Sequence, residues 1–194
     1  KLGFKGSCTC VVTACASASD SIGAAFHHIR DGYSDVMACG GAESCICELG
    51  IGGFASMKAL SDSDDPARAS IPFDKERSGF VMGEGSGILI LEEYEHAVKR
   101  GAKILGEVAG YGASCDANHM TAPLEDGSGA ADCMTLAIRD AGIEPCEVGY
   151  INAHGTGTPL NDKGETKAVK LAFGEDSKEL LISSTKSMTG HLLG

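Results

Sequence analysis

The sequence predicts an α/β fold. Short apolar runs alternate with helical patterns along the 194 residues, few polar residues interrupt these runs, and glycines follow many of the segments. Uninterrupted apolar strands are typical of sheets covered on both faces, and their alternation with helices is typical of α/β architectures. In such folds the functional loops lie beyond the carboxyl ends of strands, so we look for reactive side chains there.

The first predicted unit spans residues 1–101. An apolar strand at Val11–Thr13 leads through a turn carrying Cys15 into a helix that ends before Gly32. That helix has one apolar face, with Ile22, Ala25, Phe26 and Ile29 at helical spacing. We expect further strands within 35–41 and at 88–91, a helical stretch following 50–54 and reaching residue 60, and a charged helix over 92–100.

The second predicted unit spans residues 102–194. Its expected elements are strands at 104–111, 148–151 and 180–182, and helices at 130–141 and 162–173. The last two strands run into loops that carry His154, Lys186 and His191. Cys15 and these three side chains therefore all follow apolar strands, and their loops are candidates to converge on one pocket.

Composition excludes several classes of protein. The formal net charge of −11 and the pI of about 4.9 argue against nucleic-acid binding and against an anionic membrane surface. No apolar run has the length of a membrane span. The nine cysteines are odd in number and scattered, and neither CxxC nor HExxH occurs. This pattern favours a reducing, cytoplasmic compartment and gives no reason to expect a metal.

Cys15 is the candidate nucleophile. It lies just before a helix rich in Ala and Ser, where unpaired N–H groups and the positive end of the helix dipole favour a thiolate over a thiol. The alternative is a buried, inert cysteine packed under small neighbours, which is common for free cysteines.

Three separated motifs carry a family resemblance. They are Thr13–Ser17 (TACAS), Asn152–Pro159 (NAHGTGTP) and Thr185–His191 (TKSMTGH), and Pro72–Phe80 also agrees. Together they resemble the β-ketoacyl-ACP synthases, above all the elongating type II enzymes of bacterial fatty-acid synthesis. The resemblance implies a thiolase-like fold, layered αβαβα, and a homodimer. It also implies a fragment, with the later part of the first half and most of the second half, ending before the family's Gly-Phe-Gly loop.

The resemblance implies a decarboxylative Claisen condensation of acyl-ACP with malonyl-ACP, with Cys15 carrying the acyl group. His154 and His191 would stabilise the enolate formed from the malonyl group, and Lys186 would raise the local positive potential. The alternative for each histidine, taken alone, is a satisfied, partly buried structural residue, which is the commoner role for a single histidine. The substrates arrive on the phosphopantetheine arm of acyl carrier protein, so the reaction needs no other cofactor.

Two acidic residues match supporting positions of the family. Glu165 matches the residue that pairs with the lysine, and Asp162 matches a second acidic position on the same loop. Both also suit a simple pair of charges at a helix N-terminus.

Four residues match substrate-binding positions. Thr156, Thr158 and Thr121 match hydroxyls that meet the phosphopantetheine arm, and Phe54 matches a residue of the acyl pocket. The alternatives are turn hydroxyls that bond nearby backbone and, for Phe54, a plain core position.

Three other functions remain open from the sequence. A ketosynthase domain of a polyketide synthase would use the same chemistry on another substrate, and the HGTGT form is common there. A non-catalytic chain-length factor would usually lack the cysteine that is present here. A cysteine hydrolase using Cys15 and one histidine would leave the second histidine and Lys186 unexplained.

Overall fold

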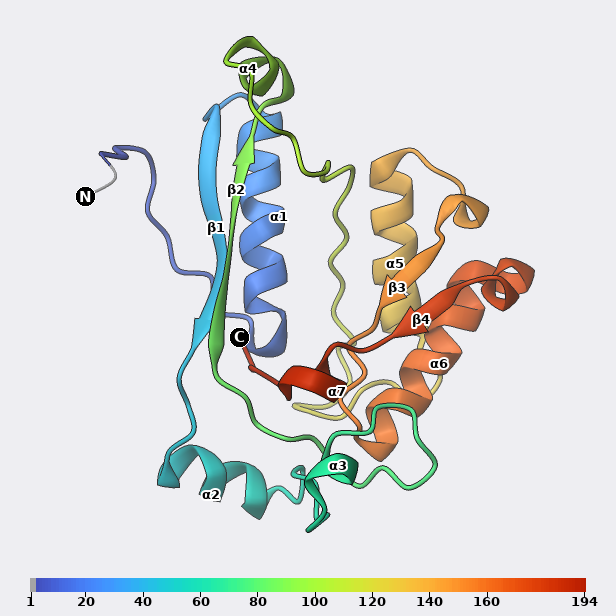
Figure 1. Ribbon diagram of the computed structural model, residues 1–194. Helices are drawn as coiled ribbons and strands as arrows, with labels where there is room; N and C mark the ends of the chain where they lie inside the picture. The colour runs from blue at the N-terminus through green and yellow to red at the C-terminus, as the bar shows by residue number, and fades with distance from the viewer. Residues whose placement is uncertain (1–2) are drawn as a thin grey trace. The chain divides into compact units, whose positions relative to one another are not determined.

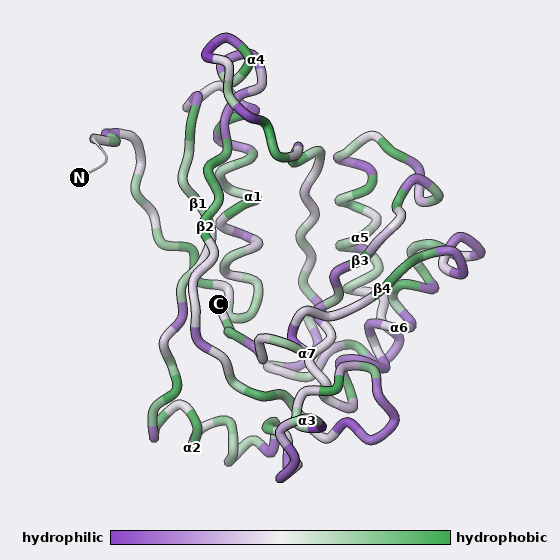
Figure 2. Tube along the Cα trace, in the orientation of Figure 1, coloured by the Kyte–Doolittle hydropathy of each residue, from purple (hydrophilic) through white to green (hydrophobic). Residues whose placement is uncertain are grey.

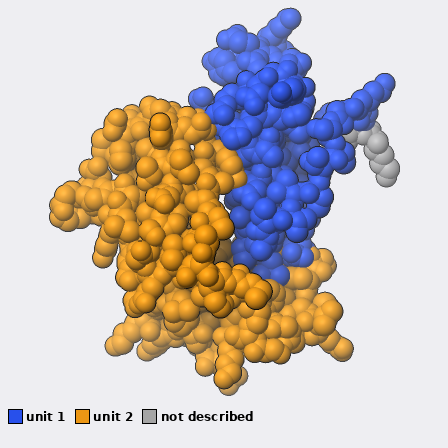
Figure 3. Space-filling view, turned by 180° about the vertical axis from the view of Figure 1, so that it is seen from behind, with its two compact units in different colours: residues 1–43, 85–108, 193–194 blue, residues 44–84, 109–192 orange. Residues whose placement is uncertain are grey.

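The computed structural model describes residues 3–194, which form two compact units (Figure 1, Figure 3). Unit 1 comprises residues 1–43, 85–108 and 193–194, and unit 2 comprises residues 44–84 and 109–192. Each unit thus draws on separate stretches of chain, and the division at residue 101 made from the sequence stays a prediction. Among the described residues, none of the helices combines the length and the apolar character that crossing a bilayer requires.

Unit 1 is built on an antiparallel pair of strands. Strand β1 (Val36–Glu43) pairs with β2 (Gly85–Glu92), from Val36 opposite Glu92 to Glu43 opposite Gly85. Helix α1 (Ser17–Arg30) packs along this pair, and α4 (Tyr94–Lys99) follows β2 (Figure 1).

Small residues bring α1 close to β1. A Cβ atom added at Gly41 would lie only 2.9 Å from the Cβ of Ala18, so the helix and the strand approach as far as their backbones allow. The backbone N–H of Gly40 donates to the Ser21 hydroxyl at 3.2 Å, which ties the same two elements together. Ala25 is buried on this helix. The Ala- and Ser-rich sequence of α1 is therefore a packing requirement.

Unit 2 contains a parallel strand pair with a helical crossover. Strand β3 (Tyr150–Asn152) pairs with β4 (Leu181–Ser183), and α6 (Pro159–Phe173) connects them. Helix α5 (Ser128–Ala141) packs against α6. The remaining helical segments are α2 (Glu48–Ser56), α3 (Pro66–Ala69), α7 (Lys186–Thr189) and two 3-10 helices, Pro145–Glu147 and Gly174–Lys178.

The core of unit 2 lies along one side of α6. Ala168, Val169 and Phe173 are buried there, and Ala131 of α5 is buried as well. Pro159 suits the first helical position because its fixed φ is already helical and its missing N–H would have no helical partner. The start of α6 therefore follows directly from the HGTGTP motif, which places the His154 loop against this helix.

The structure confirms most of the expected elements and corrects three of them. Helices α1, α5 and α6 and strands β1 to β4 lie where the periodicity predicts. The predicted strands at Val11–Thr13 and at 104–111 are wrong, because neither segment has a strand partner among the described residues. The predicted helical stretch after 50–54 begins earlier, because α2 takes in the glycines of that segment.

The apolar run at 88–91 is a strand, as predicted, but its side chains are not covered on both faces. Ile88, Leu89 and Ile90 are 59%, 47% and 59% exposed, and Figure 2 shows the apolar colouring along β2. Consecutive residues of a strand face opposite sides, so both faces of β2 present apolar surface. The expectation of a sheet buried on both faces therefore fails for this strand within residues 3–194.

Candidate active site

Cys15 lies in a tight turn at the start of α1. A 3-10 helix (Ala14–Ala16) precedes α1, and Ala14 has a φ of +52°, a conformation that costs a non-glycine residue roughly 1–3 kcal/mol. The Ser17 hydroxyl holds this turn, since it accepts from the Thr13 N–H at 2.9 Å and donates to the Ala14 carbonyl at 2.7 Å. Cys15 is exposed, which argues against the alternative of a buried packing residue.

His154 follows β3 on a loop that Glu165 fixes. The Glu165 carboxylate accepts two backbone N–H groups, that of His154 at 2.6 Å and that of Gly155 at 2.8 Å. The Asn161 amide also donates to this carboxylate, at 3.3 Å. Glu165 comes from the second turn of α6, so the helix orients the loop through one side chain. The role predicted for Glu165 as a partner of Lys186 stays a prediction.

His191 lies just after α7, and its backbone pairs with that of the segment around Met82. The N–H of His191 donates to the Val81 carbonyl at 2.6 Å, and the His191 carbonyl accepts from the Gly83 N–H at 2.8 Å. Gly190 permits this approach, because its φ is +69° and an added Cβ would lie 2.8 Å from the Val81 oxygen. His191 is only 4% exposed.

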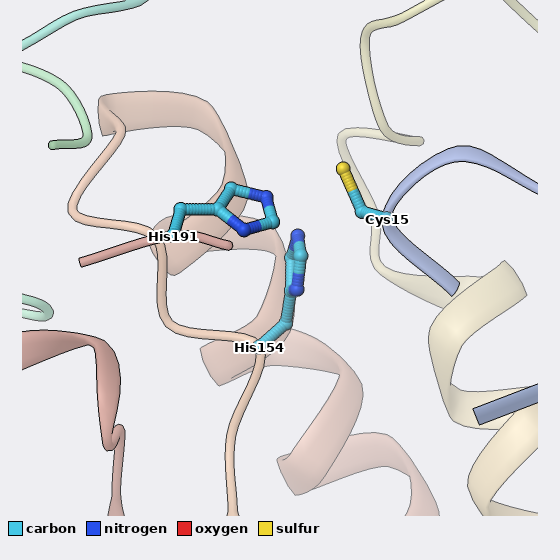
Figure 4. A group of neighbouring side chains, drawn as sticks. All are labelled: Cys15, His154 and His191. Atoms are coloured by element: carbon cyan, nitrogen blue, oxygen red, sulfur yellow. The ribbon is translucent and has the colours of Figure 1, made fainter. Parts of the chain in front are cut away.

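The two imidazoles form an edge-to-face pair within unit 2. The ring centroids of His154 and His191 are 5.4 Å apart, with an interplanar angle of 86° (Figure 4). The ring of Phe80 packs against His191 at 5.2 Å, and Phe54 packs against Phe80 at 5.2 Å. The predicted acyl-pocket residue Phe54 is therefore connected to the histidine pair through one aromatic ring.

Both histidines are held in the neutral form. Burial lowers the pKa of His154 to about 4, and the positive charge of Lys186 acts in the same direction, whereas Asp162 opposes it. Burial also lowers the pKa of His191 to about 4, with further contributions from His154 and Lys186. At neutral pH each ring therefore carries one N–H that can donate a hydrogen bond.

Lys186 begins α7, and neighbouring serines fix its backbone. The Ser70 hydroxyl donates to the Lys186 carbonyl at 2.5 Å, and the Lys186 N–H donates to the Ser184 hydroxyl at 3.3 Å. Ser184 also donates to the Gly155 carbonyl at 2.7 Å. The loops of His154 and of Lys186 thus meet at one buried hydroxyl.

Asp162 is the most buried charged group described, at 1% exposure. Its carboxylate accepts from the N–H of Phe73 at 2.7 Å and from that of Gly157 at 3.2 Å. The Arg77 guanidinium lies 3.5 Å from it and also donates to the backbone carbonyls of Thr158 and Pro159. Asp162 is therefore much more than a helix-end charge, since it joins the segment around Phe73 to the HGTGT loop.

The predicted substrate-binding hydroxyls differ in their surroundings. Thr156 is buried, and its hydroxyl lies 2.8 Å from that of Thr158, so these two oxygens are hydrogen-bonded to one another. Thr121 is exposed, and its backbone N–H donates to the ring of His119 at 3.1 Å. A pocket beside α6 is lined by His154 and Glu165 among others, and none of the predicted substrate-binding residues lines it.

Sequence reasoning missed Arg77 and Ser184. Arg77 belongs to the Pro72–Phe80 stretch that carries part of the resemblance, but its partner Asp162 lies 85 positions further along the chain. Ser184 lies in a run of small polar residues after β4. Neither residue stands out by type or by local spacing, and only the folded chain reveals their partners.

Known proteins match the chain over its whole length. Residues 1–97 match the family described as β-ketoacyl synthase, N-terminal domain, and residues 105–194 match the β-ketoacyl synthase, C-terminal domain. A 3-oxoacyl-[acyl-carrier-protein] synthase 2 of Synechocystis sp. is 58% identical over 194 residues, covering 100% of this chain and 47% of the relative. The corresponding protein of Vibrio cholerae is 54% identical over 194 residues, covering 99% of this chain and 47% of the relative.

Solved structures agree with this result. The complex of a type II PKS acyl-carrier protein with its ketosynthase bound to the hexaketide matches with a TM-score of 0.91 and 47% identity, over 93% of this chain and 45% of that chain. A β-ketoacyl synthase from Burkholderia phymatum matches with a TM-score of 0.87 and 41% identity, over 95% of this chain and 44% of that chain.

The fold is the thiolase-like α/β fold of the ketosynthases, as the motifs predict. The chain belongs to the β-ketoacyl synthase family. It spans about half the length of the curated relatives it matches.

Proposed function

We propose that the full-length protein is a β-ketoacyl-ACP synthase of fatty-acid chain elongation, which condenses acyl-ACP with malonyl-ACP by decarboxylation. The observation that carries this proposal is the pair of neutral imidazoles, His154 and His191, held edge to face by separate loops of unit 2. The curated relatives named 3-oxoacyl-[acyl-carrier-protein] synthase 2 support it.

In the first half-reaction Cys15 takes the acyl group. The Cys15 thiolate attacks the thioester carbonyl of acyl-ACP, and the phosphopantetheine thiolate leaves and takes up a proton. Sulfur suits both steps because a thiolate is a good nucleophile and a good leaving group. Backbone N–H groups at the start of α1 are suited to stabilise the oxyanion that forms on the carbonyl oxygen.

In the second half-reaction the malonyl group loses carbon dioxide. The electron pair of the broken C–C bond forms an enolate, and the neutral rings of His154 and His191 donate hydrogen bonds to its oxygen. The enolate carbon then attacks the acyl-Cys15 carbonyl, and the Cys15 thiolate leaves. The product is β-ketoacyl-ACP. A neutral ring fits this step because a donor is needed and no net proton transfer to the oxygen is required.

The remaining predicted residues support these steps. Burial is the main cause of the low pKa of both rings, and the charge of Lys186 lowers both pKa values further. Glu165 and Asp162 hold the backbone of the His154 loop. Thr156, Thr158 and Thr121 are proposed contacts of the phosphopantetheine arm, and Phe54 is a proposed wall of the acyl pocket.

The proposed partner is acyl carrier protein, and the proposed assembly is a homodimer in the cytoplasm. The solved ketosynthase bound to its acyl-carrier protein, at 47% identity, supports the first of these. The proposed reaction uses no cofactor beyond the phosphopantetheine arm that carries each substrate.

The test is condensation of a saturated acyl-ACP with malonyl-ACP by the full-length protein. We expect Cys15→Ala to abolish acyl transfer, and His154→Ala and His191→Ala to retain acylation of Cys15 but lose malonyl decarboxylation by about 100-fold or more, the usual cost of removing a charge-stabilising donor. Wild-type protein without condensation activity, or full activity of Cys15→Ala, would contradict the proposal.

A second candidate is a polyketide ketosynthase, because one matched structure is a type II PKS ketosynthase. The two functions differ in the primer that Cys15 accepts. A fatty-acid enzyme should extend saturated acyl-ACP and reject β-ketoacyl-ACP, whereas a polyketide enzyme should extend the unreduced β-ketoacyl chain. Rates with matched six-carbon primers of the two kinds would separate them.

A further inference from the structure

Ser184 lies at the point where the loops of both histidines meet. It follows β4 directly and is 6% exposed, which is unusual for a serine in a connecting segment. None of the motif matches assigns it a role. Its hydroxyl bonds backbone groups of the two loops that carry the histidines.

The Ser184 hydroxyl makes one hydrogen bond to each loop. It donates to the carbonyl of Gly155, the residue directly after His154, at 2.7 Å. It accepts from the N–H of Lys186 at 3.3 Å, and Lys186 begins the short helix that ends just before His191. One oxygen atom therefore uses its donor on the first loop and an acceptor site on the second.

The loop of His154 and the loop of His191 approach so closely at Gly155 and Ser184 that Gly155 has no room for a side chain. Gly155 has a φ of +39°, and a Cβ added there would lie 2.5 Å from the Cβ of Ser184 and 2.9 Å from the ring of Phe73. Gly155 therefore cannot carry a side chain while Ser184 occupies its place. The two residues form a close-packed contact that fixes the distance between the loops.

The β-ladder supplies this constraint only up to the residue before His154. Pairing of β3 with β4 ends at Asn152 opposite Ser183, and the Ala153 N–H makes the last backbone hydrogen bond, to the Ser183 carbonyl at 2.8 Å. Beyond that pair, a second link joins the Thr185 N–H to the Asn152 side chain at 3.3 Å, but this contact is exposed. The buried hydroxyl of Ser184 is the better-protected connection, because water competes less for a buried hydrogen bond.

We propose that Ser184 is a positioning residue, which sets the distance and angle between the His154 and His191 rings by hydrogen-bonding the backbones of both their loops. This inference rests on the proposed function for its kinetic consequence. Loss of the hydroxyl would leave the buried Gly155 carbonyl and the part-buried Lys186 N–H without this partner and would let the loops move apart. A displacement of about 1 Å at a catalytic group can cost about 100-fold in rate.

The test compares Ser184→Ala with Ser183→Ala in the full-length protein. Ser183 is the matched control, since it is the adjacent serine and its exposed hydroxyl meets only the Tyr150 hydroxyl, at 2.7 Å, among the bonds described. We expect Ser184→Ala to lower kcat for malonyl-ACP decarboxylation by about 10- to 100-fold. KM for acyl-ACP and acylation of Cys15 should stay close to wild type, and Ser183→Ala should behave as wild type throughout.

A second measurement separates positioning from the proposed chemistry. NMR titration of the imidazoles should give midpoints for His154 and His191 that move in Ser184→Ala and stay in place in Ser183→Ala, whether or not the protein condenses acyl groups. Absence of condensation in the wild type would therefore contradict the proposed function, while the titrations would still decide the role of Ser184.

Ser184→Cys keeps a side chain of similar shape with a weaker donor, so decarboxylation should rank Ser above Cys above Ala. This variant also covers the case in which Ser184→Ala does not fold. Wild-type kcat in Ser184→Ala, unmoved histidine midpoints, or a Cys variant less active than the Ala variant would each overturn the proposal.

Discussion

At the scale of single residues, the histidine pair is defined by the absence of charge. Burial is the main reason that protonation of either ring is unfavourable, and for His191 the nearby His154 ring, 5.4 Å away, adds to this effect. Lys186 adds a further positive charge that opposes protonation of either ring. At neutral pH we therefore expect His154 and His191 to be uncharged and Lys186 to carry the positive charge of this group.

This arrangement predicts the pH dependence of the pair. We expect NMR midpoints for His154 and His191 near 4, below the ordinary 6.5. Because the folded pKa is the lower one, the unfolded chain binds protons first as pH falls. The free energy of unfolding should therefore decrease between about pH 6.5 and pH 4 and be unaffected by these two groups above that range.

Lys186→Met provides the matched comparison for this pH prediction. Removing the positive charge should raise the midpoints of both rings, since Lys186 contributes to lowering each of them. Midpoints near 6.5 in the wild type, or midpoints unchanged in Lys186→Met, would contradict the electrostatic account.

Arg77 and Asp162 give a second prediction at this scale. Asp162 is 1% exposed and the Arg77 side chain 19% exposed, so Arg77→Gln would leave a buried carboxylate without its cation. We expect a loss of about 3–5 kcal/mol in the free energy of unfolding, measured by denaturant titration of the full-length protein.

Arg68→Gln is the control for this loss. Arg68 pairs with Asp74 and Glu76, but it is 44% exposed, so its removal should lower the free energy of unfolding far less than the removal of Arg77. Equal losses for the two variants would show that burial of the Asp162 pair has no special importance.

At the scale of elements, the turn before α1 depends on one hydroxyl. Ser17→Ala removes both hydrogen bonds that hold Thr13 and Ala14, while Ala14 keeps its unfavourable φ of +52°. We expect a loss of about 1 kcal/mol in the free energy of unfolding. Ser19 is exposed in the first turn of α1, so Ser19→Ala should change the free energy of unfolding by less than about 0.5 kcal/mol.

An element could be predicted from the sequence when the interactions that form it are local in the chain, and less well when they join distant residues. Helices α1, α5 and α6 have local signals, an apolar face, an N-terminal proline or a terminal glycine, and these signals were sufficient. Strands need a partner, and the apolar residues at Val11–Thr13 do not reveal whether one exists. The motifs similarly predict His154 and His191 as site residues, but the contact between their rings involves loops that Ser184 and Glu165 hold through distant backbone groups.

At the scale of the whole molecule, the exposed apolar faces of β2 have a physical cost. Strands β1 and β2 form a two-stranded sheet in the described chain, so each has an unpaired edge, and Ile88 and Ile90 are each 59% exposed. Unpaired edges and contiguous apolar surface promote association between chains.

The corresponding prediction concerns the 194 residues produced on their own. We expect concentration-dependent association by light scattering, and we expect Ile90→Lys to shift it to clearly higher concentration. Leu171→Lys is the control, because Leu171 is 61% exposed but lies on a helix, α6, and not on a strand. A monodisperse chain at all concentrations, or equal effects of the two lysine variants, would contradict this prediction.

The buried carboxylate of Asp162 also bears on how the loops of unit 2 fluctuate. The amide hydrogens of Phe73 and Gly157 lie outside regular helices and strands, yet both donate to this one group. Neither can exchange with solvent deuterium unless the carboxylate is pulled out of its surroundings, which requires a larger opening than fraying of one loop. The two amides should therefore exchange slowly and together, at rates typical of core helices, and Asp162→Asn should accelerate both.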